Sequence, residues 1–177
     1  GSGDLEGTKK SYTAGSNTYT ALSKTETSEF GAIFAEIEIP QVDGLSIGVE
    51  YIPYEATISV DGNSSDSHLT LSEHTTLYGL LMPAAANGVY FKAGYAMADI
   101  GNVKANYTTT TVNSHDNSLE GPMFGAGFQK ELISSVMGRE EVTYTDYDDV
   151  SVTTTSNGSA SVKKTGNAEL TTFTISL

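Results

Sequence analysis

The sequence predicts an all-β protein whose strands run up and down, each antiparallel to the next. Apolar and polar residues alternate with a period of two along most of the 177-residue chain, and helical periodicity is hard to find. Thr, Ser and Tyr are abundant and Pro is scarce, which also favours strands. The connections between the alternating stretches are short and long in turn, which places all short turns at one end of such a sheet.

The two kinds of connection differ in length and composition. The short ones lie at residues 40–44, 83–88 and around 134–135, and the long ones, rich in Ser, Thr, Asn, Asp and Gly, lie at residues 60–68, 101–118 and 153–166. In soluble sheets, short and long loops are not generally separated to opposite ends, whereas barrels of the bacterial outer membrane have short turns on the periplasmic side and longer loops on the outside of the cell. The pattern therefore predicts an eight-stranded antiparallel up-and-down transmembrane β-barrel.

Seven stretches alternate clearly, and the first two are residues 29–39 (EFGAIFAEIEI) and 45–54 (LSIGVEYIPY). In the first, the isoleucines share one face and two glutamates share the other. In the second, Leu, Ile, Val and Tyr lie opposite Ser, Gly and Glu. We expect this strand to continue past Pro53 with a bend, because proline cannot donate a hydrogen bond to a neighbouring strand.

The next two strands are expected at residues 69–82 (LTLSEHTTLYGLLM) and 89–98 (VYFKAGYAMA). The first places Leu69, Leu71, Leu77 and Leu81 on one face and His74 on the other. The second places Val, Phe, Tyr and Met opposite Lys92.

The last three strands are expected at residues 122–132, 136–152 and 169–177. The phenylalanines of the first lie opposite its glycines and Gln129. Val142 and Tyr144 of the second lie opposite Arg139. In the third, Phe and Ile alternate with Thr and Ser. All seven strands thus have one apolar face, which the membrane interpretation assigns to lipid.

We expect residues 1–177 to form a single β-barrel domain. Residues 1–28 are expected to be the first outside loop, with a first strand that is weak, near residues 10–13 or 17–22, or that is trimmed. Single-chain bacterial barrels have an even number of strands, so seven strands need one more. A strand supplied by a neighbouring subunit is the third alternative. The C-terminal Ile-Ser-Leu lacks the usual terminal aromatic residue, so we expect trimming there too.

Composition excludes several classes of protein. There are 22 acidic against 9 basic residues, a formal net charge of −13, which argues against nucleic acid as a partner because phosphates need a basic face. Without Cys there is neither a disulfide framework nor a cysteine zinc site. No apolar run approaches the length of a transmembrane helix. No motif predicts a cofactor, since the Gly-Ala-Gly at residues 125–127 does not open a helix.

The polar face of the predicted strands carries charges of both signs. We expect an interior charge network of Glu36, Glu38, Glu50, Lys92, Arg139 and Glu141. Small barrels have interiors just wide enough for side chains to fill. Lys92 and Arg139 would neutralise some of the carboxylates, which predicts a sealed, non-conducting interior. Four inward glycines are expected to make room for the long side chains: Gly48, Gly94, Gly125 and Gly127.

Tyrosines lie near the strand ends that are predicted to be outside. We expect an aromatic girdle of Tyr51, Tyr54, Tyr95, Tyr144 and Tyr147. Aromatic rings gather at the membrane–water boundary because the ring is apolar and the hydroxyl stays hydrated. The alternative is ordinary tyrosine packing between the strands of a soluble sandwich.

Two further groups of residues suggest weaker sites. Asp146, Asp148 and Asp149 follow a strand, and hard oxygen ligands of this kind bind Ca²⁺. The spacing is not that of an EF-hand, so solvated loop carboxylates are the preferred interpretation and no metal is expected. His74 and Ser72 are expected on the inner face, which leaves a lipid-modifying enzyme as an alternative, although a nucleophile needs its base within hydrogen-bond reach.

Three stretches resemble a known family: GVEYIPY (residues 48–54), FKAGYA (residues 91–96) and YTDYDDVSV (residues 144–152). They are similar to the small OmpA/opacity-type outer-membrane barrels of marine alphaproteobacteria, from about residue 29 to residue 177. The resemblance implies an eight-stranded barrel in the outer membrane of a Gram-negative cell. It implies no catalytic residues, because the family shares none.

The sequence therefore predicts a structural or surface role, in membrane integrity or adhesion. The expected partners are the lipid bilayer and lipopolysaccharide, together with extracellular protein or phage partners that meet the acidic loops at the cell surface. An alternative is a homo-oligomeric β-barrel subunit of a self-assembling coat, tube or filament. That alternative accounts for Glu140, a charge on the apolar face. A lipocalin-like carrier is disfavoured by the charged inner face.

Overall fold

The computed structural model describes residues 1–14, 17–19, 22–53, 55–59, 68–104, 110–133, 136–156 and 161–177. The prediction of an all-β antiparallel protein is confirmed. The described strands are β1 (Ser2–Lys9), β2 (Tyr12–Ala14), β3 (Asn17–Tyr19), β4 (Leu22–Glu29), β5 (Ile33–Glu38), β6 (Leu45–Ile52), β7 (Ala56–Ser59), β8 (His68–Leu81), β9 (Val89–Lys104), β10 (Thr110–His115), β11 (Ser118–Ile133), β12 (Val136–Asp146), β13 (Val150–Ser156) and β14 (Val162–Ser176). The short 3-10 helix η1 (Ala84–Ala86) lies between β8 and β9. Within these residues, no helix is long and apolar enough to cross a membrane.

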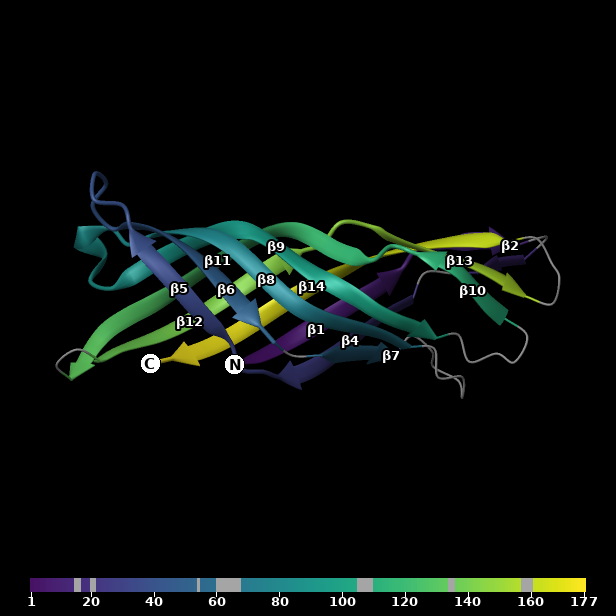
Figure 1. The fold of residues 1–177 in the computed structure, drawn as a ribbon, viewed down its shortest axis with the longest axis horizontal. Coiled ribbons are helices and arrows are strands. Elements are labelled where there is room, and N and C mark those ends of the chain that lie inside the picture. The colour runs from purple at the N-terminus through teal and green to yellow at the C-terminus, as the bar shows by residue number, and fades with distance from the viewer. Residues whose placement is uncertain are drawn as a thin grey trace.

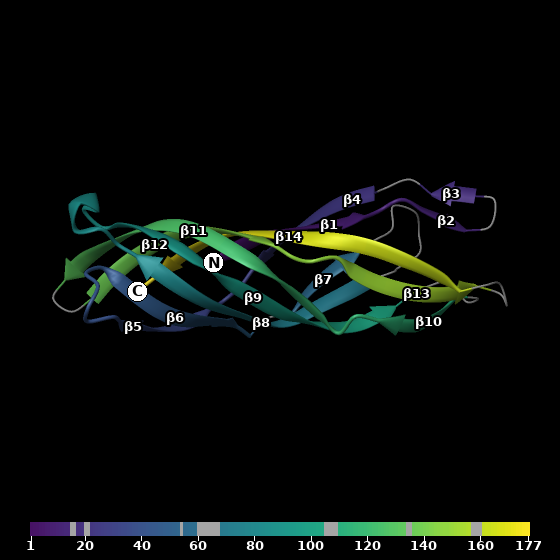
Figure 2. The same cartoon turned by 90° about the horizontal axis from the view of Figure 1, so that it is seen from above.

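Twelve of the described strands form one antiparallel sheet. Its main path is β10-β13-β14-β12-β11-β9-β8-β6-β5, with β1 between β14 and β4, and with β7 beside β8. Strands β2 and β3 form a separate hairpin. The molecule is elongated: the β5–β6 and β8–β9 connections lie at one end, and β2, β10 and β13 reach the other (Figure 1). The β2–β3 hairpin extends beyond β1 and β4 at this second end (Figure 2).

The predicted count of eight strands is not confirmed, since the structure describes fourteen strands, some of them separated by only a few residues. Strand β6 ends at Ile52 and β7 begins at Ala56, on either side of Pro53, where a bend was expected. Strand β12 likewise ends at Asp146 before β13 begins at Val150. The ladder of hydrogen-bonded pairs is not closed: it runs from β4, which pairs with β1, to β5, which pairs with β6.

The short turns lie where they were predicted. Gly44, with φ of +74°, ends the β5–β6 turn, and its carbonyl accepts a hydrogen bond from the Met82 amide at 2.7 Å. Asn87 and Gly88 both have positive φ at the end of the β8–β9 turn, and the Gly88 carbonyl accepts from the Gln129 amide at 2.8 Å. The third predicted turn, at residues 134–135, lies outside the described residues.

The N-terminal region is not the loop that the sequence analysis assigned to residues 1–28. It contains β1, β2, β3 and β4, and β1 pairs with both β14 and β4. Leu5 is the only large apolar residue of β1, and it is buried. The outward residues of this strand, such as Asp4 and Glu6, are polar, so its sequence lacks the alternation that identifies the later strands.

One apolar residue lies on the opposite face from the predicted one. Leu71 is 7% exposed and belongs to the buried core, although it was expected to point outward with the other leucines of its strand. The cause is a β-bulge between Ser72 and Thr75, where Glu73 has a φ of +52°. The extra residue reverses the alternation, so Leu71 faces inward before the bulge, whereas the even residues Thr76 and Tyr78 face inward after it.

We predict that Glu73→Gly stabilises the protein by about 0.5–1 kcal/mol, because glycine adopts the left-handed conformation without the clash of a side chain. Urea unfolding in detergent micelles measures the change. Thr75→Gly, two residues along and with ordinary backbone angles, is the matched control and is expected to be destabilising. A loss of stability in Glu73→Gly would show that the bulge is held by the Glu73 side chain instead.

Candidate functional site

An ion pair crosses the interior between β5 and β12, which are not neighbours in the sheet. Arg139 on β12 donates from Nη1 and Nη2 to the two carboxylate oxygens of Glu36 on β5, both at 2.7 Å. Tyr78 on β8 donates its hydroxyl to the same carboxylate at 2.7 Å. Gln129 on β11 accepts from the guanidinium at 2.8 and 3.2 Å. Two parallel hydrogen bonds fix the guanidinium and the carboxylate relative to each other, so the pair sets the distance between β12 and β5.

A second cluster surrounds Lys92 on β9, whose side chain is 1% exposed. Its ammonium donates to Glu141 at 2.8 Å and to Glu50 at 3.2 Å. It also lies 3.9 Å from the centre of the Tyr78 ring, a distance suited to a cation–π contact. Tyr90 donates its hydroxyl to the other oxygen of Glu141 at 2.8 Å. Because Tyr78 contacts both clusters, the two form one network.

The network contains five of the six residues that were predicted to share the interior. Glu36, Glu50 and Glu141 are its carboxylates, and Lys92 and Arg139 are its cations. All five side chains are less than a fifth exposed. Burying a charge is costly unless it is paired and hydrogen-bonded, and each of these charges is both. Glu38 is exposed at the end of β5, beside the turn.

Two glycines leave the space that this network occupies. A Cβ at Gly48 would lie 2.6 Å from the Tyr78 ring and 2.8 Å from the Glu36 side chain. A Cβ at Gly127 would lie 2.3 Å from the end of the Tyr90 ring and 2.5 Å from a backbone oxygen. Any side chain there would displace a tyrosine whose hydroxyl binds a carboxylate. Room for long charged side chains was predicted at these glycines, whereas Gly48 and Gly127 make room for Tyr78 and Tyr90.

Sequence reasoning missed an apolar layer in the interior. It lies next to the charges, toward the end of the sheet where the long loops were predicted, which we call the long-loop side. It is formed by buried side chains from several strands, among them Leu5, Leu71, Ile100, Leu119 and Met123. Strand β9 runs past the predicted end at residue 98 and includes Ile100, and β11 begins before the predicted start at residue 122 and includes Leu119. Predicting both strands at their full length would have revealed the layer. Two layers therefore fill the interior, one of charged side chains and one of apolar side chains.

A cavity of about 60 Å³ lies in this layer beside His74. Neither ring nitrogen of His74 has a hydrogen-bond partner among the described residues, and the Tyr147 ring lies 6.3 Å away, edge to face. Ser72 also lines the cavity, but no hydrogen bond joins it to His74. The nucleophile and base that the enzyme alternative requires are therefore not held together.

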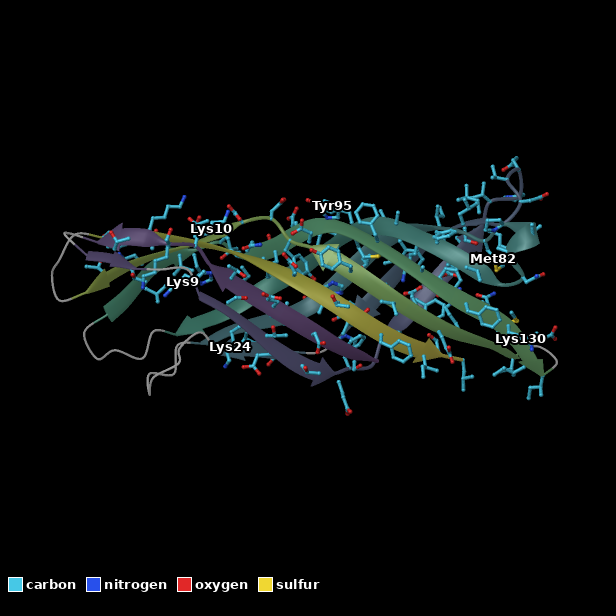
Figure 3. The ribbon with its side chains drawn as sticks, turned by 180° about the vertical axis from the view of Figure 1, so that it is seen from behind. Lys9, Lys10, Lys24, Met82, Tyr95 and Lys130 are labelled. Atoms are coloured by element: carbon cyan, nitrogen blue, oxygen red, sulfur yellow. The ribbon has the colours of Figure 1, made fainter. Side chains whose placement is uncertain are left out.

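The outer surface carries an apolar belt on the half of the sheet nearer the β5–β6 and β8–β9 turns, which we call the turn-side half. Its residues are at least 40% exposed and include Ile33, Ile37, Ile47, Leu77, Phe91, Phe124, Val142, Phe173 and Ile175. In the long-loop half, the outward residues of β1 and β4 are polar. In Figure 3, Lys9, Lys10 and Lys24 lie toward the long-loop end, and Met82 and Lys130 lie toward the turns.

The predicted tyrosine girdle is placed only in part on this surface. Tyr95 and Tyr144 are 44% and 41% exposed, and Tyr51 is half-buried on the same face. Figure 3 shows Tyr95 at the outside of the ribbon. Tyr54 lies outside the described residues. Tyr147 does not belong to the girdle: it is 3% exposed, because its odd separation from Tyr144 places it on the inner face.

The acidic residues at the end of β12 and directly after it do not gather into a metal site. Asp149 forms an ion pair with Lys10 at 2.5 Å, and Asp146 and Asp148 are exposed. Among the residues that the structure describes, no three acidic or histidine side chains are placed to hold a metal ion. The carboxylate of Asp149 instead ties the region after β12 to the end of β1.

No protein-family model and no curated protein matches this chain. The resemblance to small outer-membrane barrels therefore stays a prediction.

We predict that Gly127→Ala destabilises the protein by about 1–3 kcal/mol, because the added methyl group displaces Tyr90 and breaks its bond to Glu141. Gly79→Ala is the matched control, since a Cβ there meets nothing closer than 3.9 Å. Urea unfolding in micelles compares the two variants. Equal stabilities would mean that the Tyr90 contact does not constrain the interior.

We predict that Arg139→Met costs about 3 kcal/mol, because it leaves the Glu36 carboxylate buried without its cation. Glu36→Gln combined with Arg139→Met is expected to cost less than the sum of the single variants, since no uncompensated charge remains. A double-mutant cycle by urea unfolding measures the coupling. Strict additivity would contradict a direct pairing across the interior.

Proposed function

We propose that the chain is a transmembrane β-barrel of the outer-membrane type, with a structural and surface-interaction role and a non-conducting interior. In this proposal β4 and β5 are the two halves of one wall strand, joined through Phe30, Gly31 and Ala32. The pairs β6–β7, β10–β11 and β12–β13 are counted as one wall strand each in the same way. Together with β1, β8, β9 and β14 they make eight. An even number of antiparallel strands suits a single-chain barrel.

The observation that carries this proposal is the outward apolar belt around an ionic interior. A water-soluble sheet protein buries its isoleucines and phenylalanines and exposes its glutamates and arginines. Here Ile37 is 70% exposed and Phe91 is 58% exposed, whereas the Arg139 side chain is 10% exposed. This arrangement is favourable if hydrocarbon covers the belt.

The interior supports a structural role over transport. The Glu36–Arg139 pair crosses the lumen, and Leu119 and Met123 are almost wholly buried in the layer beyond it. An aqueous channel requires a polar lumen wide enough for water, as in barrels of 16 or more strands. We therefore assign interaction to the polar long-loop half, with the bilayer and lipopolysaccharide as immediate partners and extracellular protein or phage partners at the cell surface.

We predict that Phe91→Trp is strongly quenched by lipids brominated in their acyl chains once the protein is folded in vesicles. The chain has no natural tryptophan, so the introduced one is a unique reporter. Asp99→Trp, on the outward face of the same strand but outside the belt, is the matched control and is expected to be quenched weakly. Equal quenching at both positions, or none at Phe91→Trp, would overturn the membrane assignment.

We predict no stepwise ion conductance when the folded protein is inserted into a planar bilayer, because two filled layers block the lumen in series. Insertion is verified by the quenching measurement above, and a wide porin in the same bilayer is the positive control. Steady conductance by the wild-type protein would contradict a sealed interior.

A second candidate, a subunit of a self-assembling coat, tube or filament, is favoured by Glu140. This carboxylate is exposed on the apolar face, between Phe128 of β11 and Ile175 of β14. A charge facing lipid is unfavourable at the membrane centre, whereas a subunit contact can pair it. Sedimentation of ordered particles without detergent, together with absent quenching of Phe91→Trp, would favour this candidate over the membrane barrel.

A further inference from the structure

The cavity of about 60 Å³ beside His74, which we call the His74 cavity, contains a polar group without a partner. Both ring nitrogens of His74 are buried, and neither has a hydrogen-bond partner within the described residues. Most of the other lining residues are apolar, among them Leu5, Phe30, Ile52 and Leu71. A neutral imidazole has one donor and one acceptor nitrogen, and burying either without a partner is unfavourable. This composition suits a ligand that carries a small polar group.

A strained β-bulge aims His74 into this cavity. The bulge lies between Ser72 and Thr75 and contains Glu73 and His74, two residues of β8 opposite one of β9. Glu73 has a φ of +52°, a conformation that is unfavourable for a residue with a side chain. Bulges of this kind re-aim side chains beside active and binding sites. A backbone that keeps this strain and leaves an imidazole without a partner indicates a function for His74.

The wall next to the cavity loses its pairing because of a proline. The Ile39 amide donates to the Leu45 carbonyl, so the odd residues of β5 bond to β6, as far as Ile33. The next bonded pair would join Gly31 to Pro53, but proline has no amide to donate. A Cβ at Gly31 would meet nothing within 4 Å, so no neighbouring group closes the wall at this point.

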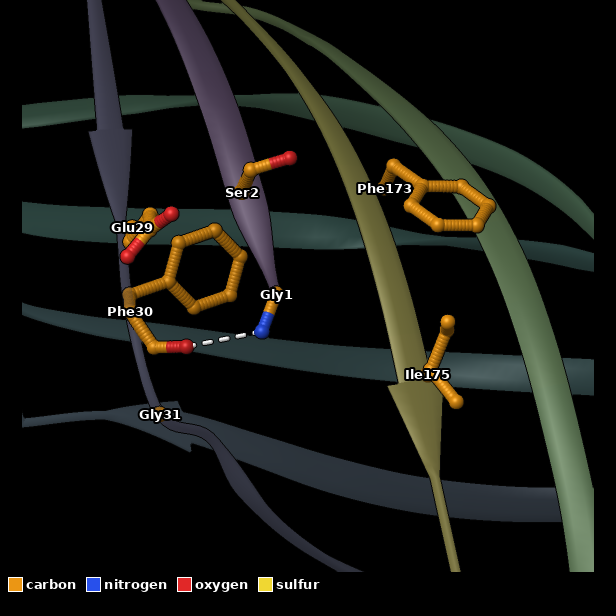
Figure 4. A pocket seen from close by; sticks show the side chains of 7 residues that line it. All are labelled: Gly1, Ser2, Glu29, Phe30, Gly31, Phe173 and Ile175. Atoms are coloured by element: carbon orange, nitrogen blue, oxygen red, sulfur yellow. Dashed lines mark hydrogen bonds between the residues drawn. The ribbon is translucent and has the colours of Figure 1, made fainter.

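Beyond this point, β4 follows β1 and leaves the side of β7. Gly1 and Phe30 exchange two backbone hydrogen bonds, of 2.8 and 2.9 Å, and Figure 4 shows the first of them. Within the described pairs, β4 pairs only with β1 and β7 only with β8, and Figure 2 shows β4 and β7 apart. We call this unpaired stretch, which begins at Phe30 and Ile52, the β4–β7 seam. The His74 cavity lies directly behind it, since both of these residues line the cavity.

We propose that the His74 cavity binds the carboxyl group of a long-chain fatty acid, whose alkyl chain leaves through the β4–β7 seam. A cavity of about 60 Å³ has the volume of roughly two water molecules, which is room for a carboxyl group. It is too small for an aromatic ring, which a cavity of about 150 Å³ holds. The carboxyl group and the imidazole share one proton, so the bound pair is neutral overall and both polar groups gain a partner.

The height of the cavity suits a fatty acid in a bilayer. Met97 is the last belt residue on β9 and pairs with Thr75, so His74 lies at the long-loop boundary of the apolar belt. A fatty acid keeps its carboxyl group at the boundary of the hydrocarbon and its alkyl chain within it. The chain would then lie on the belt over Ile33, which is 67% exposed. This placement of the alkyl chain rests on the proposed membrane function.

The test uses the protein with ¹⁵N-labelled histidine rings, folded in micelles of a non-ionic detergent, and decanoic acid as the probe. Nuclear magnetic resonance follows the ring signals, and those of His74 are identified by their loss in His74→Phe. We expect decanoic acid to shift the His74 signals saturably and to leave those of His115 on β10 unchanged. Decane has the same length without the carboxyl group and is expected to cause no saturable shift.

Ser28→Leu fills the cavity from β4, and Ser28→Ala is the matched control that leaves the space free. We expect the leucine variant to bind decanoic acid at least about tenfold more weakly than the alanine variant. Ala98→Leu and Ala98→Ser repeat the comparison from β9, which keeps the test decisive if one filled variant does not fold.

An unshifted His74 ring, an equal shift with decane, or binding that neither leucine variant weakens would overturn the proposal and assign the cavity to ordered water. The quenching of Phe91→Trp in vesicles is a separate measurement. Quenching without a His74 shift would refute the fatty acid site and leave the membrane function standing. A His74 shift without quenching would refute the membrane function and support the site.

Discussion

The structure depends on one constraint: a strand places successive side chains on opposite faces, so an apolar outer face requires the intervening residues to be accommodated inside. In β5, Ile33 and Ile37 point outward, and Glu36 must then lie in the interior. A buried carboxylate needs a cation, and Arg139 supplies it from β12 through two bonds of 2.7 Å. The outward belt and the internal ion pairs are therefore consequences of the same pattern.

The network also determines which small residues the walls need. Tyr78 and Tyr90 reach carboxylates on other strands, and both rings pass over positions where no side chain fits. Gly48 and Gly127 are therefore explained by the tyrosines opposite them. The packing of the interior links residues that are more than forty positions apart, so its geometry belongs to the whole sheet and to no single hairpin.

Sequence alone could predict the strands whose two faces differ in polarity. It identified β9 and the turn-side half of β8, and it placed Lys92 and Arg139 on the inner face. It could not predict which cation meets which carboxylate, because Glu36 and Arg139 are 103 residues apart and several registers are compatible with the pattern. It missed β1, because the outward residues of this strand are as polar as the neighbouring sequence and no apolar alternation marks it. It misplaced Leu71, because a bulge at Glu73 reverses the alternation of β8, and it misplaced Tyr147, which is three residues from Tyr144 and therefore lies on the opposite face.

The apolar belt covers only the turn-side part of the long strands. On β9 it ends near Met97, and the strand continues through Asp99 to Lys104 with its hydrogen bonds to β8 maintained. In the proposed membrane setting, this polar portion of the paired strands would separate the ends of the hairpins from the apolar belt, so a partner could bind there without entering the hydrocarbon.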